Sequence, residues 1–258
     1  GKNLEVDGVL DLKGQNYTTN TFNGGGRVTS SEVGDVWLQV NNSGTFSGLL
    51  EDGSGRLSFR KSGGSNLTLS GDNTYSGLTT VNTSGYLSIA HSNALGATAS
   101  GTVVGNNGTL DISGDISVGV EALSLTGDGY TTNKGALHNS SGSNTWSGTI
   151  DLQGSSRVYM TVASGSELEL QAASSITSSD NTPLRFYTWG DMDIKGIIAH
   201  GSGILEKYQD GTLSLEGNNT YTGATSITNG IVRISHDNAL GDVSGSTSVS
   251  NAASLVLE

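Results

Sequence analysis

Apolar residues recur along this chain in short alternating pairs and not at helical spacing. Leu67 and Leu69 stand two positions apart with a polar residue between them, and Leu87 and Ile89 do the same. Such pairs predict strands of three to five residues with one buried face. Glycine, asparagine and aspartate fill the segments between them and permit tight turns. We therefore expect many short strands and no helix longer than a turn.

One long stretch of this pattern occurs twice. Residues 67–96 read LTLSGDNTYSGLTTVNTSGYLSIAHSNALG, and residues 213–241 read LSLEGNNTYTGATSITNGIVRISHDNALG. The likeness continues on both sides, so the repeat units cover approximately residues 48–112 and 196–257. A duplicated unit of this length indicates a repeat architecture.

Both copies, and two weaker echoes, place an aromatic residue two positions before a glycine. These aromatic residues are Phe46, Tyr75, Trp146 and Tyr221. Their shared position predicts side chains that cover a corner of the repeating unit.

Strands this short cannot close a core alone, but they can if the chain coils and lays each turn in parallel on the preceding one. Equivalent strands follow one another at intervals of roughly 19 to 23 residues, as at Leu67, Leu87 and Leu110. The interval predicts an all-β, parallel β-helix (β-solenoid) of about eleven to twelve coils, formed as a single segment by residues 1–258. At the usual strand spacing this rod is roughly 50–60 Å long.

Composition agrees with short strands and tight turns. The chain has 39 glycines, one proline and no cysteine, and charged residues make up 14% of it, against roughly 25% in an average globular domain. Disorder does not fit, because alternating apolar pairs persist along the whole length. The absence of cysteine excludes disulfides and thiolate catalysis.

The net charge of −12 makes nucleic acid and anionic membrane surfaces poor partners. No apolar run reaches the eighteen or so residues of a membrane span, so we expect the chain itself not to be membrane-inserted. It begins at Gly1 and ends at Glu258 within an apolar alternation, which leads us to expect a fragment of a longer protein.

The GDNTYSG…LG and GNNTYTG…LG blocks, with Gly-x-Gly-x-Leu before them and Gly-x-Leu-x-apolar after them, resemble the passenger-associated transport repeat of Gram-negative type V autotransporters. The resemblance covers both repeat units well and the remainder only through the general strand pattern. It implies a right-handed β-helix at the cell surface or secreted, in a parent chain with a C-terminal outer-membrane barrel. Passengers of this family include adhesins, self-associating proteins, proteases, esterases and toxins, so activity does not follow from the repeat.

Candidate nucleophiles and histidines are few. Ser54 and Ser166 stand in glycine-rich strings inside the repeat pattern, and such strings arise readily in this composition. His91 and His236 occupy equivalent positions in the two copies, which favours a shared structural role at a coil corner. The two remaining histidines, His138 and His200, stand alone in the sequence, and we expect them to be solvated.

Candidate metal ligands and catalytic carboxylates are also sparse. The acidic residues that stand close together are Glu51, Asp52, Glu167, Glu169, Asp191 and Asp193. No tandem Gly-Gly-x-Gly-x-Asp repeats accompany them, so we expect solvated turn carboxylates, no metal and no cofactor. Glu167 and Glu169 flank Leu168 and therefore point outward together. With Asp191 and Asp193 they are candidates for the acid pair of a β-helix carbohydrate-active enzyme, only because they stand close together in the sequence.

One segment departs from the pattern. After the sole proline, Pro183, come Arg185, Phe186, Tyr187 and Trp189. The segment is either an extruded loop with a binding surface or a stretch whose rings are buried in the coil. We take these four residues as the candidate binding surface.

These observations favour a non-enzymatic passenger fragment that acts as an adhesin or as a self-association module in aggregation, biofilm formation and virulence. Stacked serine, threonine, asparagine and aspartate side chains provide long polar faces, and many weak contacts along two rods can sum to strong binding. The expected partners are neighbouring passengers, or a protein or glycan on a host cell. The alternatives are a stalk that carries an enzymatic or toxic domain and, less favoured, the carbohydrate-active enzyme.

Overall fold

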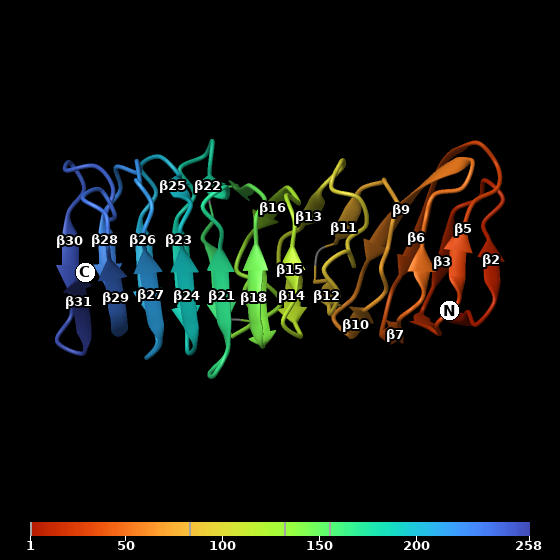
Figure 1. Ribbon diagram of the computed structural model, residues 1–258, viewed down its shortest axis with the longest axis horizontal. Helices are drawn as coiled ribbons and strands as arrows, with labels where there is room; N and C mark the ends of the chain where they lie inside the picture. Colours follow the sequence, from red (N-terminus) through yellow and green to blue (C-terminus); the bar gives the residue numbers. More distant parts are fainter. Residues whose placement is uncertain (1, 83, 132, 155) are drawn as a thin grey trace.

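The chain folds into a parallel β-solenoid of about eleven turns, as a computed structural model shows (Figure 1). The structure describes residues 2–82, 84–131, 133–154 and 156–258. Within these ranges no helix is present, so none is long and apolar enough to cross a membrane. The prediction of an all-β, parallel β-solenoid is confirmed. Its right-handed sense stays a prediction.

Each turn contributes up to three strands, one to each of three faces. The ten-strand sheet has in spatial order β7 (Gly44–Phe46), β10 (Asn66–Leu69), β12 (Tyr86–Ile89), β14 (Thr109–Ser113), β17 (Leu137–Ser141), β20 (Val158–Val162), β23 (Leu184–Thr188), β26 (Leu205–Tyr208), β28 (Thr225–Ile227) and β30 (Thr247–Val249). The pair β1 (Asn3–Glu5) and β4 (Thr21–Asn23) continues this face through a bridge between Gly24 and Phe46.

Two further stacks complete the coil. The nine-strand sheet has β3 (Tyr17–Thr19), β6 (Gly34–Val40), β9 (Gly55–Lys61), β11 (Thr79–Val81), β13 (Thr102–Val104), β16 (Leu123–Thr126), β19 (Ile150–Gln153), β22 (Ser175–Thr177) and β25 (Ile197–Ala199). The seven-strand sheet has β15 (Ser117–Val118), β18 (Ser143–Trp146), β21 (Glu167–Leu170), β24 (Asp191–Ile194), β27 (Thr212–Leu215), β29 (Gly230–Ile234) and β31 (Ala253–Leu257). A three-strand sheet holds β2 (Val9–Asp11), β5 (Arg27–Thr29) and β8 (Leu49–Leu50).

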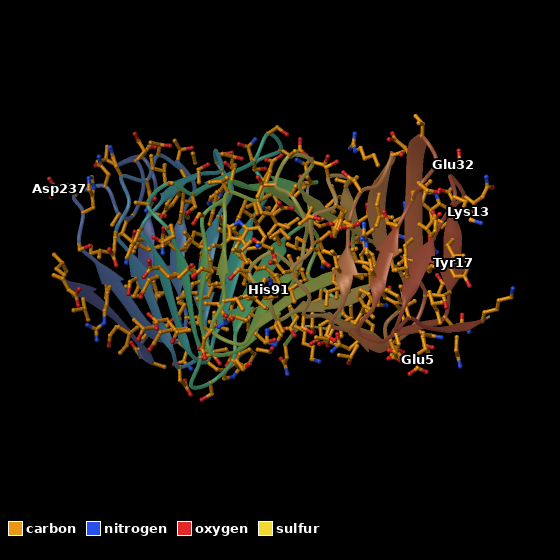
Figure 2. The ribbon with its side chains drawn as sticks, turned by 45° about the vertical axis from the view of Figure 1, so that its right-hand side comes forward. Glu5, Lys13, Tyr17, Glu32, His91 and Asp237 are labelled. Carbon is orange, nitrogen blue, oxygen red and sulfur yellow. The ribbon has the colours of Figure 1, made fainter. Side chains whose placement is uncertain are left out.

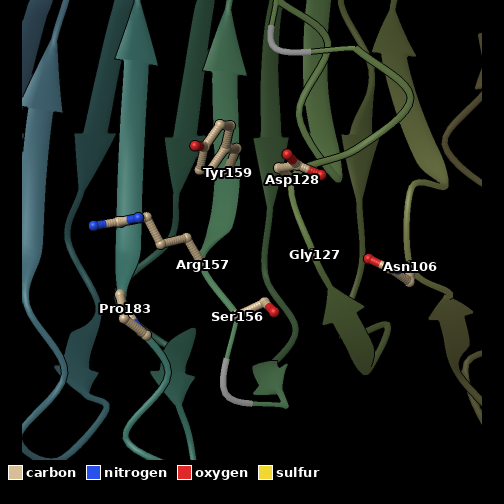
Figure 3. A pocket seen from close by; sticks show the side chains of 7 residues that line it. All are labelled: Asn106, Gly127, Asp128, Ser156, Arg157, Tyr159 and Pro183. Atoms are coloured by element: carbon tan, nitrogen blue, oxygen red, sulfur yellow. The ribbon is translucent and has the colours of Figure 1, made fainter.

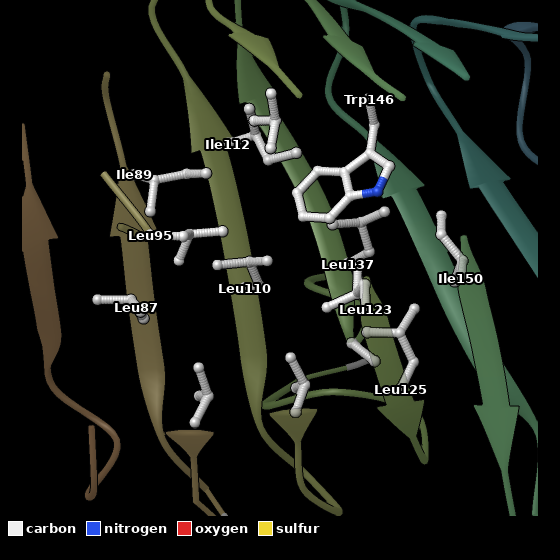
Figure 4. Close-up of a cluster of buried hydrophobic side chains, with 14 of the residues drawn as sticks. Leu87, Ile89, Leu95, Leu110, Ile112, Leu123, Leu125, Leu137, Trp146 and Ile150 are labelled. Atoms are coloured by element: carbon white, nitrogen blue, oxygen red, sulfur yellow. The ribbon is translucent and has the colours of Figure 1, made fainter. Parts of the chain in front are cut away.

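The core is a set of stacked aliphatic ladders. Leu87, Leu110 and Leu137 pair in register on successive turns and are completely buried (Figure 4). Alternate residues of the same strands point to the outer surface, which explains the period-2 pattern of the sequence. The four aromatic residues of the repeats and echoes, Phe46, Tyr75, Trp146 and Tyr221, are also fully buried inside the coil.

A buried asparagine joins three successive turns in each repeat. The Oδ1 atom of Asn73 accepts the backbone N–H of Leu50 at 2.8 Å, and its Nδ2 atom donates to the carbonyl of Ala94 at 2.7 Å. In the second copy Asn219 makes the same two bonds, to Ile198 at 2.8 Å and to Ala239 at 2.6 Å. These segments form no regular strand, so the asparagine supplies the coil-to-coil bonds that a strand pair would otherwise make.

Glycine opens each of these segments because neighbouring turns approach closely there. A Cβ atom on Gly71 would lie 1.8 Å from the carbonyl oxygen of Gly48, and one on Gly217 would lie 2.0 Å from that of Gly196. Any side chain would therefore push the two turns apart.

The two copies of the repeat point to different sides of the rod. The strand that opens the first copy is β10, in the ten-strand sheet, whereas its equivalent in the second copy is β27, in the seven-strand sheet. After β10, six further turns each add one strand to the ten-strand sheet, namely β12, β14, β17, β20, β23 and β26. The next strand along the chain, β27, lies on the next face. The copies are thus separated by six full turns and one face.

A buried lysine precedes each copy and has equivalent surroundings in both. Lys61 and Lys207 are completely buried, and each stands six residues before the first leucine of its repeat. Lys207 Nζ donates to the carbonyls of Tyr208 at 2.9 Å and Gln209 at 2.7 Å; Lys61 Nζ donates to those of Ser62 and Gly63. Burial lowers the pKa of both ammonium groups to about 8, so they remain largely protonated donors at neutral pH.

Burial shifts the pKa of two other ionisable side chains toward their neutral forms. His200 is fully buried against the ring of Tyr221, with the centroids 5.3 Å apart, and burial lowers its pKa to about 4. The expectation that His200 is solvated is therefore wrong, because its ring packs inside a corner of the second repeat unit. Glu121 accepts a hydrogen bond from Thr102 Oγ1 at 2.8 Å, and burial raises its pKa to about 7.

We predict that Asn73→Leu lowers the free energy of unfolding by about 2–4 kcal/mol. The substitution removes a donor and an acceptor from two buried backbone groups, each of which costs roughly 1–3 kcal/mol when left unpaired. Urea denaturation measures the loss, and amide hydrogen exchange at Leu50 locates it. Asn93→Leu is the control, since Asn93 is exposed and its side-chain amide bonds only Asp72 among the described residues. Equal effects from the two variants would contradict the role given to Asn73.

We predict that stability rises more steeply with pH between about 4.5 and 7 in Glu121→Gln than in the wild type, in which Glu121 opposes the rise that the lowered pKa of His200 produces. In that window the folded chain keeps the Glu121 proton while the unfolded chain has lost it, so deprotonation favours unfolding. The full effect is at most about 3 kcal/mol. Thermal denaturation between pH 4 and 8 tests this, with the exposed Glu5→Gln as the control. Parallel pH profiles for all three proteins would show that Glu121 does not titrate as stated.

Candidate functional site

The segment 184–189 consists of the regular strand β23 (Leu184–Thr188) and the residue that follows it, Trp189. Leu184, Phe186 and Thr188 point into the core and are fully buried, while Arg185, Tyr187 and Trp189 lie on the outer face, half-buried. The expected break in the pattern is therefore absent, and the segment is not an extruded loop. Of the four candidate surface residues, Phe186 belongs to the core, and the other three are brought together on the outside of the ten-strand sheet.

Aromatic rings from three successive turns meet on this outer face. Tyr187 stacks on Tyr208 of the next turn, with ring centroids 5.1 Å apart and 11° between the planes. It also contacts Tyr159 of the preceding turn at 5.4 Å and Trp189 at 6.1 Å. We call Tyr159, Arg185, Tyr187, Trp189 and Tyr208 the aromatic ridge.

An ion pair fixes the centre of the ridge. The guanidinium of Arg185 donates to Glu206 Oε1 at 2.9 Å and to Oε2 at 2.7 Å, and its carbon lies 4.6 Å from the ring centroid of Tyr208. Arg157 donates to the same carboxylate through Nε at 3.0 Å. Bidentate pairing and cation–π contacts together hold Arg185 in one orientation.

A loop covers the same face on its N-terminal side. Residues 127–131 and 133–135, here called the overhang, follow β16 and fold over β12 and β14. Tyr130 stacks parallel to Tyr86 at 6.2 Å, and Lys134 Nζ lies 4.4 Å from the Tyr86 ring and donates to its hydroxyl at 3.2 Å. This cover was not predictable, because the overhang has the composition of an ordinary turn.

Ser88, Asp111 and His138 lie on neighbouring strands at this covered part of the sheet, but they do not form a catalytic triad. The Ser88 hydroxyl donates to Asp111 Oδ2 at 2.7 Å, whereas His138 Nδ1 contacts Thr161 Oγ1 at 2.7 Å. All four side chains are buried, and burial lowers the pKa of His138. A nucleophile would have to contact the histidine and be open to a substrate. The expectation that His138 is solvated is wrong, and its role here is structural.

The other two histidines occupy coil corners, as predicted. His91 Nδ1 accepts the backbone N–H of Asn93 at 3.2 Å, and His236 Nδ1 accepts that of Asn238 at 3.0 Å. Figure 2 shows His91 among the side chains of the middle turns. Asp52 is similarly engaged: its carboxylate accepts the N–H of Leu57 at 2.8 Å and the hydroxyl of Ser76.

The four carboxylates of the enzymatic alternative meet on the outer face of the seven-strand sheet. Glu167 pairs in register with Asp191, and Glu169 with Asp193. Glu167, Asp191 and Asp193 line a shallow groove of about 320 Å³, whereas Glu169 pairs with Lys195 Nζ at 2.7 Å. Across the described ranges, no three histidine or acidic side chains are grouped so that they could hold a metal ion.

Comparison with known proteins agrees with this geometry. The family described as passenger-associated-transport-repeat matches residues 59–89 and 205–234. The adhesin BmaC autotransporter of Brucella suis biovar 1 (strain 1330) is 28% identical over 263 residues, an alignment that covers 100% of this chain but only 6% of that protein. No solved structure matches the chain.

The repeats and the solenoid define a passenger-type β-helix. The chain carries two passenger-associated transport repeats, is distantly related to an autotransporter adhesin, and has a passenger-like solenoid fold. Passenger domains are exposed at the cell surface or secreted. The two matched regions begin at Phe59 and Leu205, two residues before the buried lysines, so each lysine belongs to its repeat.

We predict that Glu206→Ala lowers the free energy of unfolding by about 2–4 kcal/mol, because it leaves the largely buried Arg185 charge unpaired. Only 13% of the Arg185 side chain is exposed. Glu258→Ala is the control, since its partner Arg233 is 46% exposed and such surface pairs contribute at most about 1 kcal/mol. The double variant Arg185→Met, Glu206→Met should regain most of the loss in urea denaturation. A loss as large for Glu258→Ala would refute the distinction.

Proposed function

We propose that this chain is a non-enzymatic adhesive module of a passenger displayed on the outer surface of a Gram-negative cell, in a parent chain anchored by a C-terminal outer-membrane barrel. The aromatic ridge carries the proposal. Tyrosine, tryptophan and arginine are the residues that contribute most to binding energy at protein interfaces, and here they stand together on an otherwise Ser/Thr/Asn-rich surface. The adhesin named among the comparisons supports the same assignment at a distance.

The ridge is pre-organised for contact. Stacking between Tyr187 and its neighbours, and the ion pair of Arg185 with Glu206, already restrict the side-chain rotamers. A partner that docks on them therefore loses less side-chain entropy than it would on a flexible surface. Because the strands below are bonded on both sides, the rod presents the ridge as a rigid feature.

Self-association is the second form of this proposal. Every copy of the chain carries the same ridge, so two passengers on neighbouring cells can present identical surfaces to each other, as a two-fold interface requires. Aggregation and biofilm formation would then follow from passenger–passenger contact, and attachment to a host protein or glycan from the first form.

We predict that beads coated with the chain attach to epithelial cells or clump together, and that the variant Tyr187→Ser, Trp189→Ser reduces this at least about fivefold, a loss of roughly 1 kcal/mol for a single contact. Counting attached beads and measuring bead clusters by light scattering separates the two forms. Tyr17→Ser, which changes a half-buried tyrosine on the nine-strand sheet, is the control. Inert wild-type beads would refute adhesion and favour a stalk.

A further inference from the structure

A groove of about 470 Å³ opens beside the aromatic ridge, on its N-terminal side (Figure 3). Its walls come from three turns: Asn106 after β13, Gly127 and Asp128 of the overhang, and Tyr159 of β20, with Arg157 and Pro183 at the rim. The volume lies within the roughly 300–1,000 Å³ of sites that bind small ligands.

Tyr159 gives this groove an aromatic wall. On its C-terminal side the ring contacts Tyr187 at 5.4 Å and Arg185 at 5.2 Å, and its hydroxyl accepts Arg185 Nη1 at 3.1 Å. On the other side the register places Ala136, the residue just before β17, beside Tyr159, because Leu137 pairs with Met160. The small alanine side chain leaves that ring face unstacked, so it borders the groove.

The Asn106 amide and the Asp128 carboxylate also line the groove, and in the described part of the chain neither takes part in the hydrogen bonds between turns. Among the described residues, neither the Asn106 amide nor the Asp128 carboxylate makes a side-chain hydrogen bond, and both are exposed. Comparable turn residues such as Asn73, Asn93 and Asp52 are all bonded to neighbouring turns. A polar group without a structural partner at the wall of a groove is available to a ligand.

Two further features keep the groove open. Gly127 has a φ of +80°, and a Cβ atom there would lie 2.2 Å from Asn106 Oδ1. Arg157 points away from Asp128 in Figure 3, toward Glu206, to which its Nε donates at 3.0 Å. The Asp128 carboxylate is therefore not neutralised by the nearest guanidinium.

We propose that this groove binds an uncharged hexopyranose unit of a surface glycan. A pyranose has an apolar C–H face that packs on an aromatic ring and a rim of hydroxyls that both donate and accept. Tyr159 matches the face, the Asp128 carboxylate accepts from two adjacent hydroxyls, and the Asn106 amide serves as donor and acceptor. Asp128 and the net charge of −12 disfavour carboxylated, sulfated or phosphorylated sugars. This inference rests on the adhesive function and names its ligand class.

The test is saturation-transfer NMR and calorimetry of the chain with galactose, mannose, glucose and N-acetylglucosamine, and with glucuronic acid as the charged probe. We expect at least one neutral sugar to bind with a Kd on the order of 1 mM, and glucuronic acid at least tenfold more weakly. No binding of any neutral sugar, or a preference for glucuronic acid, would overturn the proposal.

Two matched pairs of variants locate the site. Asp128→Ala and Tyr159→Leu are expected to weaken sugar binding at least tenfold. Asp35→Ala removes another exposed carboxylate without a side-chain bond among the described residues, and Tyr17→Leu removes a half-buried tyrosine on the nine-strand sheet, outside the groove and the ridge. Both should bind as the wild type does. If Tyr159→Leu unfolds the ridge, Asp128→Ala still decides, and unchanged binding in that variant would refute the groove.

The bead assay distinguishes this proposal from the adhesive function. Attachment to cells that persists in Asp128→Ala and is not reduced by the neutral sugar would refute the groove and leave adhesion standing. Sugar binding by a chain that attaches to nothing would refute adhesion and leave the groove as an isolated sugar site.

Discussion

Parallel hydrogen bonding between successive turns is the constraint on which this molecule depends. It places each residue directly above its equivalent in the preceding turn, as with Leu67, Leu87 and Leu110, so one inward position becomes a continuous ladder. The same constraint acts on polar atoms, because every backbone group inside the stack needs a partner on an adjacent turn. Where no strand is available, Asn73 and Asn219 supply both bonds from one side chain.

The constraint also decides which ionisable groups the interior tolerates. Lys61 and Lys207 keep their ammonium groups because each reaches two carbonyls at a corner. His200 has no such partner and is held as a neutral ring, and Glu121 holds a proton at moderately acid pH. At these corners the carbonyls of a turn provide the acceptors that a buried ammonium needs.

Most of the fold could be predicted from the sequence, but less of the candidate site could. Period-2 pairs and a twice-repeated block were enough to predict a parallel solenoid, because both follow from contacts between adjacent turns. The burial of His138 and His200 was not predictable, because it depends on how the overhang folds over the sheet and on the ring of Tyr221 from the next turn. Tyr159 and Tyr208 were missed for a related reason. The number of residues per turn varies, so the sequence alone does not show that these two tyrosines lie next to Tyr187 on the neighbouring turns. Aromatic residues about one turn apart were the available signal.

The rotation between the two repeats has an evolutionary consequence. Recombination between the matching blocks would delete everything from β10 to β27 and fuse two related sequences at equivalent positions. The shortened gene product would still coil, since the junction is native on both sides. Yet the excision removes six turns and one extra face, so every surface beyond the junction would be turned by about a third of a revolution relative to the part before it. Unequal crossing-over in such a gene therefore changes the direction in which a passenger presents its distal surfaces as well as its length.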